Sequence, residues 1–91
     1  MIYRVEIKEQ AEHDLIRLAK SEPKAFLKAQ RFIEELKIHP KTGTGHPEPL
    51  RGDRSGQWSR QITKKHRMIY EIKEKEIMVL VITAYGHYGD K

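Results

Sequence analysis

Cysteine is absent from this sequence of 91 residues. Its absence excludes disulfide bonds, catalysis by a thiolate and zinc sites built on cysteine, and it leaves the compartment open. The sequence also lacks any apolar run near the roughly 20 residues that a membrane-spanning helix requires. Its first residues alternate polar and apolar side chains, whereas a signal peptide would show a continuous apolar block. We therefore expect a cytoplasmic protein that does not contact a membrane.

Internal repeats, low-complexity segments and room for a second core are also missing. A chain of this size buries only somewhat more than ~60% of the surface that its unfolded form exposes, which allows one modest core. With 37% apolar and 34% charged residues, the composition is typical of a folded globular domain rather than of a disordered segment. We therefore expect a single domain over residues 1–91.

Positive charge is present in excess, and it is concentrated in one stretch. The chain has 18 Lys and Arg against 13 Asp and Glu, a formal charge of +5. Between residues 51 and 67 the only acid is Asp53, and the cationic side chains are Arg51, Arg54, Arg60, Lys64, Lys65 and Arg67. A basic patch beside aromatic residues suits a polyanion, because neutralised phosphates release counterions. Charge alone leaves a solvated basic face equally open as an interpretation.

The N-terminal part of the chain predicts one strand and two helices. Residues 1–8 alternate as a half-buried strand does. Residues 9–20 have apolar side chains at helical spacing, with Asp14 on the polar side. A second helix is predicted over residues 23–37, with a buried stripe of Phe26, Ala29, Ile33 and Leu36. Two helices joined so tightly should form an antiparallel pair on one face of a sheet.

The C-terminal part predicts the sheet. After a loop rich in proline and glycine, strands are expected at residues 58–63, 67–73 and 77–84, with a short extension at 48–51 beside the first. The last strand is apolar at both parities, which predicts a central strand buried on both faces. The fold class is therefore α+β, with two N-terminal helices packed on one face of a small, twisted, mainly antiparallel sheet.

Strand periodicity also predicts where Arg67 points. In the strand at 67–73, Arg67 has the opposite parity to Met68 and Tyr70. If Met68 and Tyr70 pack against the helices, Arg67 faces outward from the uncovered side of the sheet.

Three polar residues far apart in the sequence form a set that could cleave RNA. Cleavage by the RNA's own 2′-hydroxyl requires a base for that proton, a cation for the charge that grows on the phosphate and an acid for the leaving 5′-oxygen. Glu48, Arg67 and His87 offer a carboxylate, a guanidinium and an imidazole, so no metal ion is required. Each of these residues alone is more often a solvated or structural side chain, so composition and spacing do not establish the site.

Two further residues, His66 and Arg60, allow two interpretations each. His66 could poise a proton or contact ribosomal RNA, but we expect it to be mainly a structural or RNA-facing residue. Arg60 shares its strand parity with Trp58, which predicts a hydrogen-bonded, partly buried guanidinium without a catalytic role, while its place in the basic stretch groups it with the RNA-binding residues. The remaining histidines show no metal-binding spacing, and we expect neither a metal nor a cofactor; these are His13, His39 and His46.

Four ordered motifs resemble the YoeB (Txe) branch of the RelE-type toxins, and the resemblance extends over nearly the whole chain. They are GHPEPL at residues 45–50, SGQWSRQI at 55–62, HRMIY at 66–70 and HY at 87–88. The resemblance implies a single RelE-like toxin domain with the small fold of microbial ribonucleases. It also implies the toxin of a type II toxin-antitoxin system, a ribosome-dependent endoribonuclease (mRNA interferase) that cuts mRNA in the A site.

On the matching positions, the resemblance implies that Glu48 is the general base, Arg67 the transition-state cation and His87 the general acid. Tyr88 would orient the substrate or stack on it. The residues expected to bind RNA are Arg51, Arg54, Arg60, Lys64, Lys65, His66 and Tyr85. The implied partners are mRNA, the ribosome and an acidic, partly disordered antitoxin of the YefM/Axe type, and members of this branch are often homodimers.

The chain departs from the family pattern at two places. Gln61 stands where many relatives have a second basic residue, and Gly86 and Gly89 flank the His87-Tyr88 pair. Glycines on both sides leave the terminal backbone freer, so the sequence places His87 less firmly than Arg67. Two other functions stay open: a toxin of the same fold that acts on a protein such as DNA gyrase, and an RNA- or antitoxin-binding module without activity.

Overall fold

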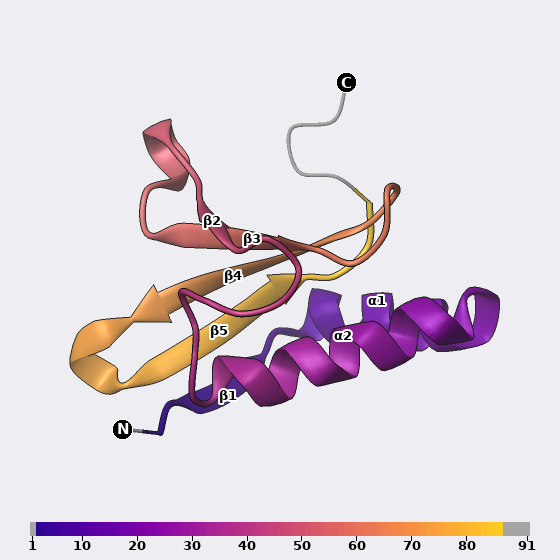
Figure 1. Ribbon diagram of the computed structural model, residues 1–91, viewed down its shortest axis with the longest axis horizontal. Helices are drawn as coiled ribbons and strands as arrows, with labels where there is room; N and C mark the ends of the chain where they lie inside the picture. Colours follow the sequence, from indigo (N-terminus) through magenta and orange to yellow (C-terminus); the bar gives the residue numbers. More distant parts are fainter. Residues whose placement is uncertain (1, 87–91) are drawn as a thin grey trace.

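Two helices lie against one face of a five-stranded sheet in the computed structural model, which describes residues 2–86 (Figure 1). The helices α1 (Glu9–Ser21) and α2 (Pro23–Leu36) follow the first strand, β1 (Arg4–Ile7). The other strands are β2 (Glu48–Pro49), β3 (Gln57–Gln61), β4 (Arg67–Lys73) and β5 (Met78–Thr83). Short 3₁₀ turns form at Gly52–Arg54 and Glu74–Glu76. The predicted α+β class is confirmed.

The sheet is mainly antiparallel, as predicted, with the strand order β1-β5-β4-β3-β2. The neighbours β5 and β4, β4 and β3, and β3 and β2 are antiparallel, whereas β1 runs parallel to β5. A parallel pair needs a crossover connection, which α1 and α2 provide. The short extension expected beside the strand of Trp58 is β2, in which Glu48 pairs with Ser59.

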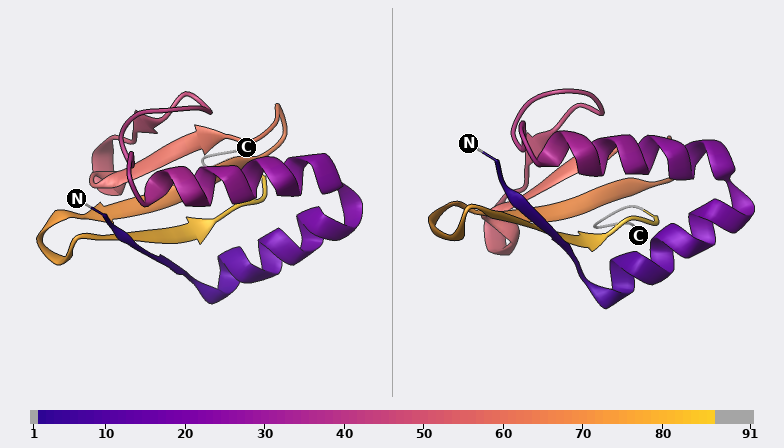
Figure 2. Two further views of the ribbon diagram at one scale, coloured as in Figure 1. Left: turned by 60° about the horizontal axis from the view of Figure 1, so that its bottom comes forward. Right: turned by 90° about the horizontal axis from the view of Figure 1, so that it is seen from below.

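β5 is central by pairing, but it is buried more completely on one face than on the other. Val79 and Val81 are fully buried in the core, whereas Leu80 and Ile82 remain partly exposed on the opposite face. The expectation of burial on both faces is met only in part: Met78, which shares the parity of Leu80, is buried, but the helices cover only one face of the sheet (Figure 2). We call the uncovered side the open face.

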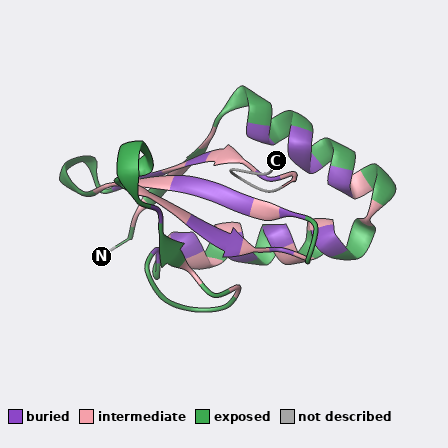
Figure 3. Cartoon of the chain, turned by 90° about the horizontal axis from the view of Figure 1, so that it is seen from above, coloured by how far each residue is buried: buried purple, intermediate pink, exposed green. Residues whose placement is uncertain are grey.

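The helices bury an apolar stripe toward the sheet and expose their other sides (Figure 3). In α2 the buried residues are Ala25, Ala29, Phe32 and Leu36. The predicted stripe has Ala29 and Leu36 in common with the observed one. The other two predicted residues, Phe26 and Ile33, lie at the edge of the observed stripe and are only partly buried. Two stripes with helical spacing overlap in this segment, and the position of the sheet selects between them. No helix within residues 2–86 is long and apolar enough to cross a membrane.

Arg60 of β3 lies in the core with no exposed surface. Its guanidinium donates to Glu35 Oε1 at 2.6 Å and to the Tyr70 hydroxyl at 3.2 Å. It also donates to three main-chain carbonyls of the loop between α2 and β2, at 2.5 to 3.2 Å: those of His39, Thr42 and Thr44. The predicted hydrogen-bonded guanidinium is confirmed and its burial is complete. The prediction that Arg60 contacts RNA is wrong, because the side chain lies on the helix-covered face with its donors used inside the protein.

Glu35 completes this network from α2. Its carboxylate accepts hydrogen bonds from Thr44 Oγ1 at 2.7 Å and from Thr44 N at 3.0 Å. Burial acts to raise the pKa of Glu35, but the hydrogen bonds from Thr44 and the Arg60 guanidinium together outweigh it and hold this pKa below its usual value. Burial raises the pKa of Tyr70, whose hydroxyl donates to the Pro40 carbonyl at 2.8 Å. The network therefore fixes the loop that leads toward Glu48.

Gly45 sets the point at which this loop turns toward β2. Its φ of +83° lies in the left-handed region, and a Cβ at this position would lie 2.5 Å from the Phe32 ring. Its carbonyl accepts a hydrogen bond from the Gln61 N–H at 2.7 Å. Both the backbone angle and the close approach require glycine. Since Gly45 begins the motif that contains Glu48, the core residue Phe32 and the strand β3 together set where that carboxylate is presented.

Candidate active site

Glu48 and Arg67 meet on the open face, although they are far apart in the sequence. Glu48 in β2 pairs with Ser59 of β3, which in turn pairs with Ile69 of β4. Arg67 begins β4 with the parity of Ile69, opposite to the buried Met68 and Tyr70, as the sequence predicted. Arg67 Nη1 lies 3.7 Å from Glu48 Oε1, and the two side chains are 22% and 55% exposed. A carboxylate and a guanidinium thus lie together within reach of an outside partner.

A shallow hollow next to Glu48 adds two further cations. It has a volume of about 480 Å³ and is lined by Glu48, Pro49, Leu50, Arg51 and Arg54. Arg51 and Arg54 are exposed at the 3₁₀ turn that precedes β3. The arrangement suits an anionic group, such as a phosphate, lying next to the Glu48 carboxylate.

The basic stretch between residues 51 and 67 does not form one patch. The turn that carries Arg51 and Arg54 and the turn that carries Lys64 and Lys65 lie at opposite ends of β3 (Figure 1). Lys64 and Lys65 are exposed, so contact with a long polyanion stays open to them. Arg60, between the two turns, is buried on the other face. Charges that are close in sequence are therefore separated by the length of a strand and by its alternation.

His66 is buried, with 3% of its surface exposed, and both of its ring nitrogens have partners. Nε2 lies 2.6 Å from Glu22 Oε2, and Nδ1 accepts a hydrogen bond from the Gly86 N–H at 2.9 Å. Of the two roles expected for His66, structural or RNA-facing, this burial fits the structural one. The prediction that it binds RNA is wrong, because the imidazole has no open edge for a nucleotide.

Tyr85 lies against the same histidine. Its ring centroid is 4.2 Å from that of His66, and the Arg17 guanidinium lies 4.0 Å from the Tyr85 ring. The tyrosine is partly buried and packs against the core. These contacts use the ring within the fold, and stacking of Tyr85 on a base stays a prediction.

His87 and Tyr88 lie outside the described residues, so their roles as general acid and substrate contact stay predictions. The last described residue is Gly86, whose carbonyl accepts a hydrogen bond from the Arg67 N–H at 2.8 Å. The end of the described chain is therefore tied to the first residue of β4. Gly86 has a φ of +77°, and both its N–H and its carbonyl are bound, so the expected freedom of the backbone does not apply at this residue.

Sequence reasoning missed two polar residues near the site. Glu22 lies at the joint between α1 and α2 and is the partner of His66, 44 positions away. Ser59 lies opposite Glu48 with no exposed surface, and its Oγ has no hydrogen-bond partner among the described residues. Neither has a local signature, because each contact depends on the pairing of distant segments. The same part of the chain contains no group of three or more histidines and acids placed to bind a metal ion.

Comparison with solved structures defines the class of protein. A YoeB/ParE toxin from Agrobacterium tumefaciens is 30% identical and superimposes with a TM-score of 0.86, covering 93% of this chain and 99% of its own. YoeB from Staphylococcus aureus, solved as a dimer and in complex with YefM, is 21% identical and shares the fold. Its TM-scores are 0.82 and 0.79, over 97% of this chain and 100% of its own. The fold is therefore that of the small RelE-like toxins, as the motifs implied.

Sequence comparison then identifies the family. The profile of the YoeB-like toxin of bacterial type II toxin-antitoxin systems matches residues 7–88. A YoeB toxin from Streptomyces coelicolor is 37% identical over 75 residues, which are 82% of this chain and 87% of that protein. The chain belongs to the YoeB-like family of type II toxins.

Proposed function

We propose that this toxin is a ribosome-dependent endoribonuclease that cleaves mRNA in the A site. The observation that carries the proposal is the pairing of Glu48 with Arg67 on the open face, at 3.7 Å, in a member of this family. Glu48 is more than half exposed, and a hollow with two more arginines adjoins it. An exposed ion pair of this kind contributes little to stability, so the fold alone gives no strong reason for placing it beside two more arginines.

The chemistry proceeds from groups that RNA and protein already have. Glu48 takes the proton of the 2′-hydroxyl, and the 2′-oxygen then bonds to the adjacent phosphorus. Arg67 exchanges its contact with Glu48 for the phosphate oxygens, on which negative charge grows. The bond from phosphorus to the 5′-oxygen breaks, and this oxygen takes a proton from an acid, the role proposed for His87. The products are a 2′,3′-cyclic phosphate and a 5′-hydroxyl end.

The partners follow from the same surface and from the family. The Staphylococcus aureus relative has been solved in complex with YefM and as a dimer. We propose an antitoxin of the YefM type for this chain, acidic enough to cover Arg51, Arg54 and Arg67. A disordered acidic segment can wrap such a surface and be removed by proteolysis, which allows reversible control. A homodimer is a second assembly that this likeness supports.

Primer extension on a translated mRNA after induction tests the activity. We expect cuts within codons that occupy the A site, and we expect them to disappear in Glu48→Gln, which removes the base while keeping the side chain's shape. Arg31→Ala is the matched control, because Arg31 is exposed on α2, in the helix layer that covers the other face of the sheet. Growth arrest without any RNA cut would overturn the proposal and favour a protein target, such as DNA gyrase. Binding to antitoxin with neither arrest nor cleavage would overturn it in favour of an inactive binding module.

A further inference from the structure

Of the three residues after β5, Ala84 and Gly86 are held by hydrogen bonds, and Tyr85 between them is held by ring contacts. The Ala84 N–H donates to Asp14 Oδ2 at 2.9 Å, and Asp14 is buried in α1, contrary to its predicted place on the polar side. The Gly86 N–H donates to His66 Nδ1 at 2.9 Å, and the Gly86 carbonyl accepts from the Arg67 N–H at 2.8 Å. The chain is thus fixed from the end of β5 to a point adjacent to the proposed transition-state cation.

The hydrogen bond from Gly86 shows which ring nitrogen of His66 carries the hydrogen. A main-chain N–H can only donate, so Nδ1 must carry a lone pair and no hydrogen. The imidazole then carries its proton on Nε2 and donates it to Glu22 Oε2 at 2.6 Å. With 3% of its surface exposed, His66 has little access to water as a substitute partner. The carboxylate, the imidazole and the Gly86 amide therefore form one continuous chain of hydrogen bonds.

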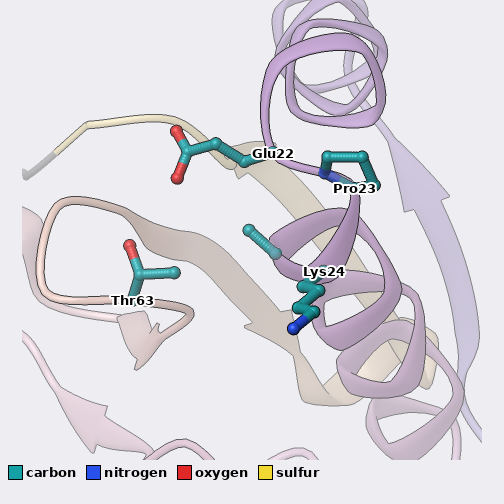
Figure 4. Close-up of a pocket in the computed structure, with 5 residues that line it drawn as sticks. Glu22, Pro23, Lys24 and Thr63 are labelled. Carbon is teal, nitrogen blue, oxygen red and sulfur yellow. The ribbon is translucent and has the colours of Figure 1, made fainter.

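Glu22 is itself well placed to hold the ring. It lies at the sharp joint of the helical hairpin, where its N–H donates to the Leu18 carbonyl at 2.7 Å and caps α1. Its carboxylate points away from Lys24, beside a hollow also lined by Pro23, Ala25 and Thr63 (Figure 4). The Thr63 hydroxyl accepts from the His66 N–H at 3.1 Å, which fixes the main chain of the histidine as well.

We propose that His66 is a positioning residue: while its Nε2–H donates to Glu22, the lone pair on its Nδ1 holds the Gly86 amide next to the first residue of β4, Arg67. The residue bonded to Gly86 is His87, so this part of the inference rests on the proposed function, in which His87 supplies the proton to the leaving oxygen. A buried histidine that only filled the core would need neither a defined tautomer nor an amide partner in the terminal segment. The structure gives His66 both.

The tautomer can be measured on the full chain without any substitution. In the protein labelled with ¹⁵N at histidine, we expect the His66 signals of a neutral ring with hydrogen on Nε2, and slow hydrogen exchange at the Gly86 amide. A ring protonated on Nδ1, or a Gly86 amide that exchanges as fast as an open backbone amide, would overturn the proposal. This measurement does not depend on cleavage.

Two substitutions then test the roles of the two ring nitrogens of His66 one at a time. In His66→Asn the amide oxygen can accept from Gly86 in the place of Nδ1, whereas in His66→Gln the amide nitrogen can donate to Glu22 in the place of Nε2. We expect slow exchange at Gly86 to persist in His66→Asn and to be lost in His66→Gln. His13→Gln is the control, since His13 is an exposed histidine of α1.

Cleavage kinetics complete the test. Displacing a reacting group by about 1 Å lowers the reaction rate on the order of 100-fold. His66→Gln should therefore lower kcat by about 10- to 100-fold while KM for the programmed ribosome stays unchanged. His66→Asn should retain most of the activity. Equal loss of kcat in both variants, both remaining folded, would overturn the positioning role. If the Gly86 amide behaves as expected but the unaltered toxin cuts no RNA, the hydrogen-bond chain stands and the proposed function fails.

Discussion

Arg60 and Arg67 are the same side chain on neighbouring strands, and the sheet gives them opposite surroundings. Arg60 pairs with Met68 and points into the helix-covered face, where its guanidinium holds a carboxylate, a hydroxyl and three carbonyls. Arg67 pairs with Gln61 and points to the open face, where Glu48 lies 3.7 Å away. The difference is one of strand parity, and it separates a cation that holds the loop leading to the site from a cation that lies beside Glu48 on the open face.

The largest expected effect on stability comes from removing the buried arginine, Arg60. Arg60→Ala should destabilise the protein by about 3–5 kcal/mol, because it leaves Glu35 without its cationic partner and three loop carbonyls without their donor in a low-dielectric core. Urea denaturation followed by circular dichroism measures the loss. Arg31→Ala, an exposed arginine of α2, should change stability by less than about 0.5 kcal/mol. A small loss in Arg60→Ala would mean that water replaces the guanidinium, and the loop would not depend on it.

The complementary prediction concerns the open side. Arg67→Ala should destabilise the protein less than Arg60→Ala does, because the Arg67 side chain and its partner Glu48 are partly exposed whereas Arg60 is fully buried. It should lower the rate of mRNA cleavage by about 10²–10³-fold, as the removal of a single stabilising donor from a transition state does. Single-turnover cleavage on programmed ribosomes measures the second effect. A variant that loses stability and keeps its rate would reverse the roles of the two arginines.

These two residues also show what the sequence could predict. The parity of Arg67, the strand at Glu48 and the motifs around them were readable, because alternation and family motifs are local patterns. The prediction of a single basic patch was wrong, because the cationic residues are distributed over the whole length of β3 and Arg60 points into the core. The partners Glu22 and His66, 44 positions apart, come together only when the helical joint packs against the start of β4. No local pattern encodes that contact.

A smaller effect should appear in the pH dependence of stability through Glu35. Its pKa is held below the usual value of 4.5 by Thr44 and Arg60, against the opposing effect of burial. A carboxyl with a lowered folded-state pKa contributes stability that is complete above its unfolded-state pKa and is lost as the pH falls through the folded-state value. The difference in unfolding free energy between the protein and Glu35→Gln should therefore be largest near neutral pH and shrink below pH 4.5.

Denaturant titrations at several pH values measure this difference. Glu34→Gln is the matched control, because Glu34 is an exposed neighbour whose ion pair with Lys37 lies at the surface of α2. A constant gap between the protein and Glu35→Gln from pH 7 to pH 3 would show that the charge on Glu35 contributes nothing to the Arg60 network.

Ser59 combines one property of each arginine, and it carries the smallest predicted effect. It shares the open-face parity of Arg67 and the complete burial of Arg60, yet its hydroxyl has no hydrogen-bond partner within residues 2–86. An unpaired buried hydroxyl costs about 1–3 kcal/mol, so Ser59→Ala should leave the free energy of unfolding unchanged or raise it by up to about 1 kcal/mol. Ser55→Ala, in the exposed turn before β3, serves as the control in the same denaturation experiment. A loss of more than about 1 kcal/mol in Ser59→Ala would contradict this prediction and show that the buried hydroxyl stabilises the fold.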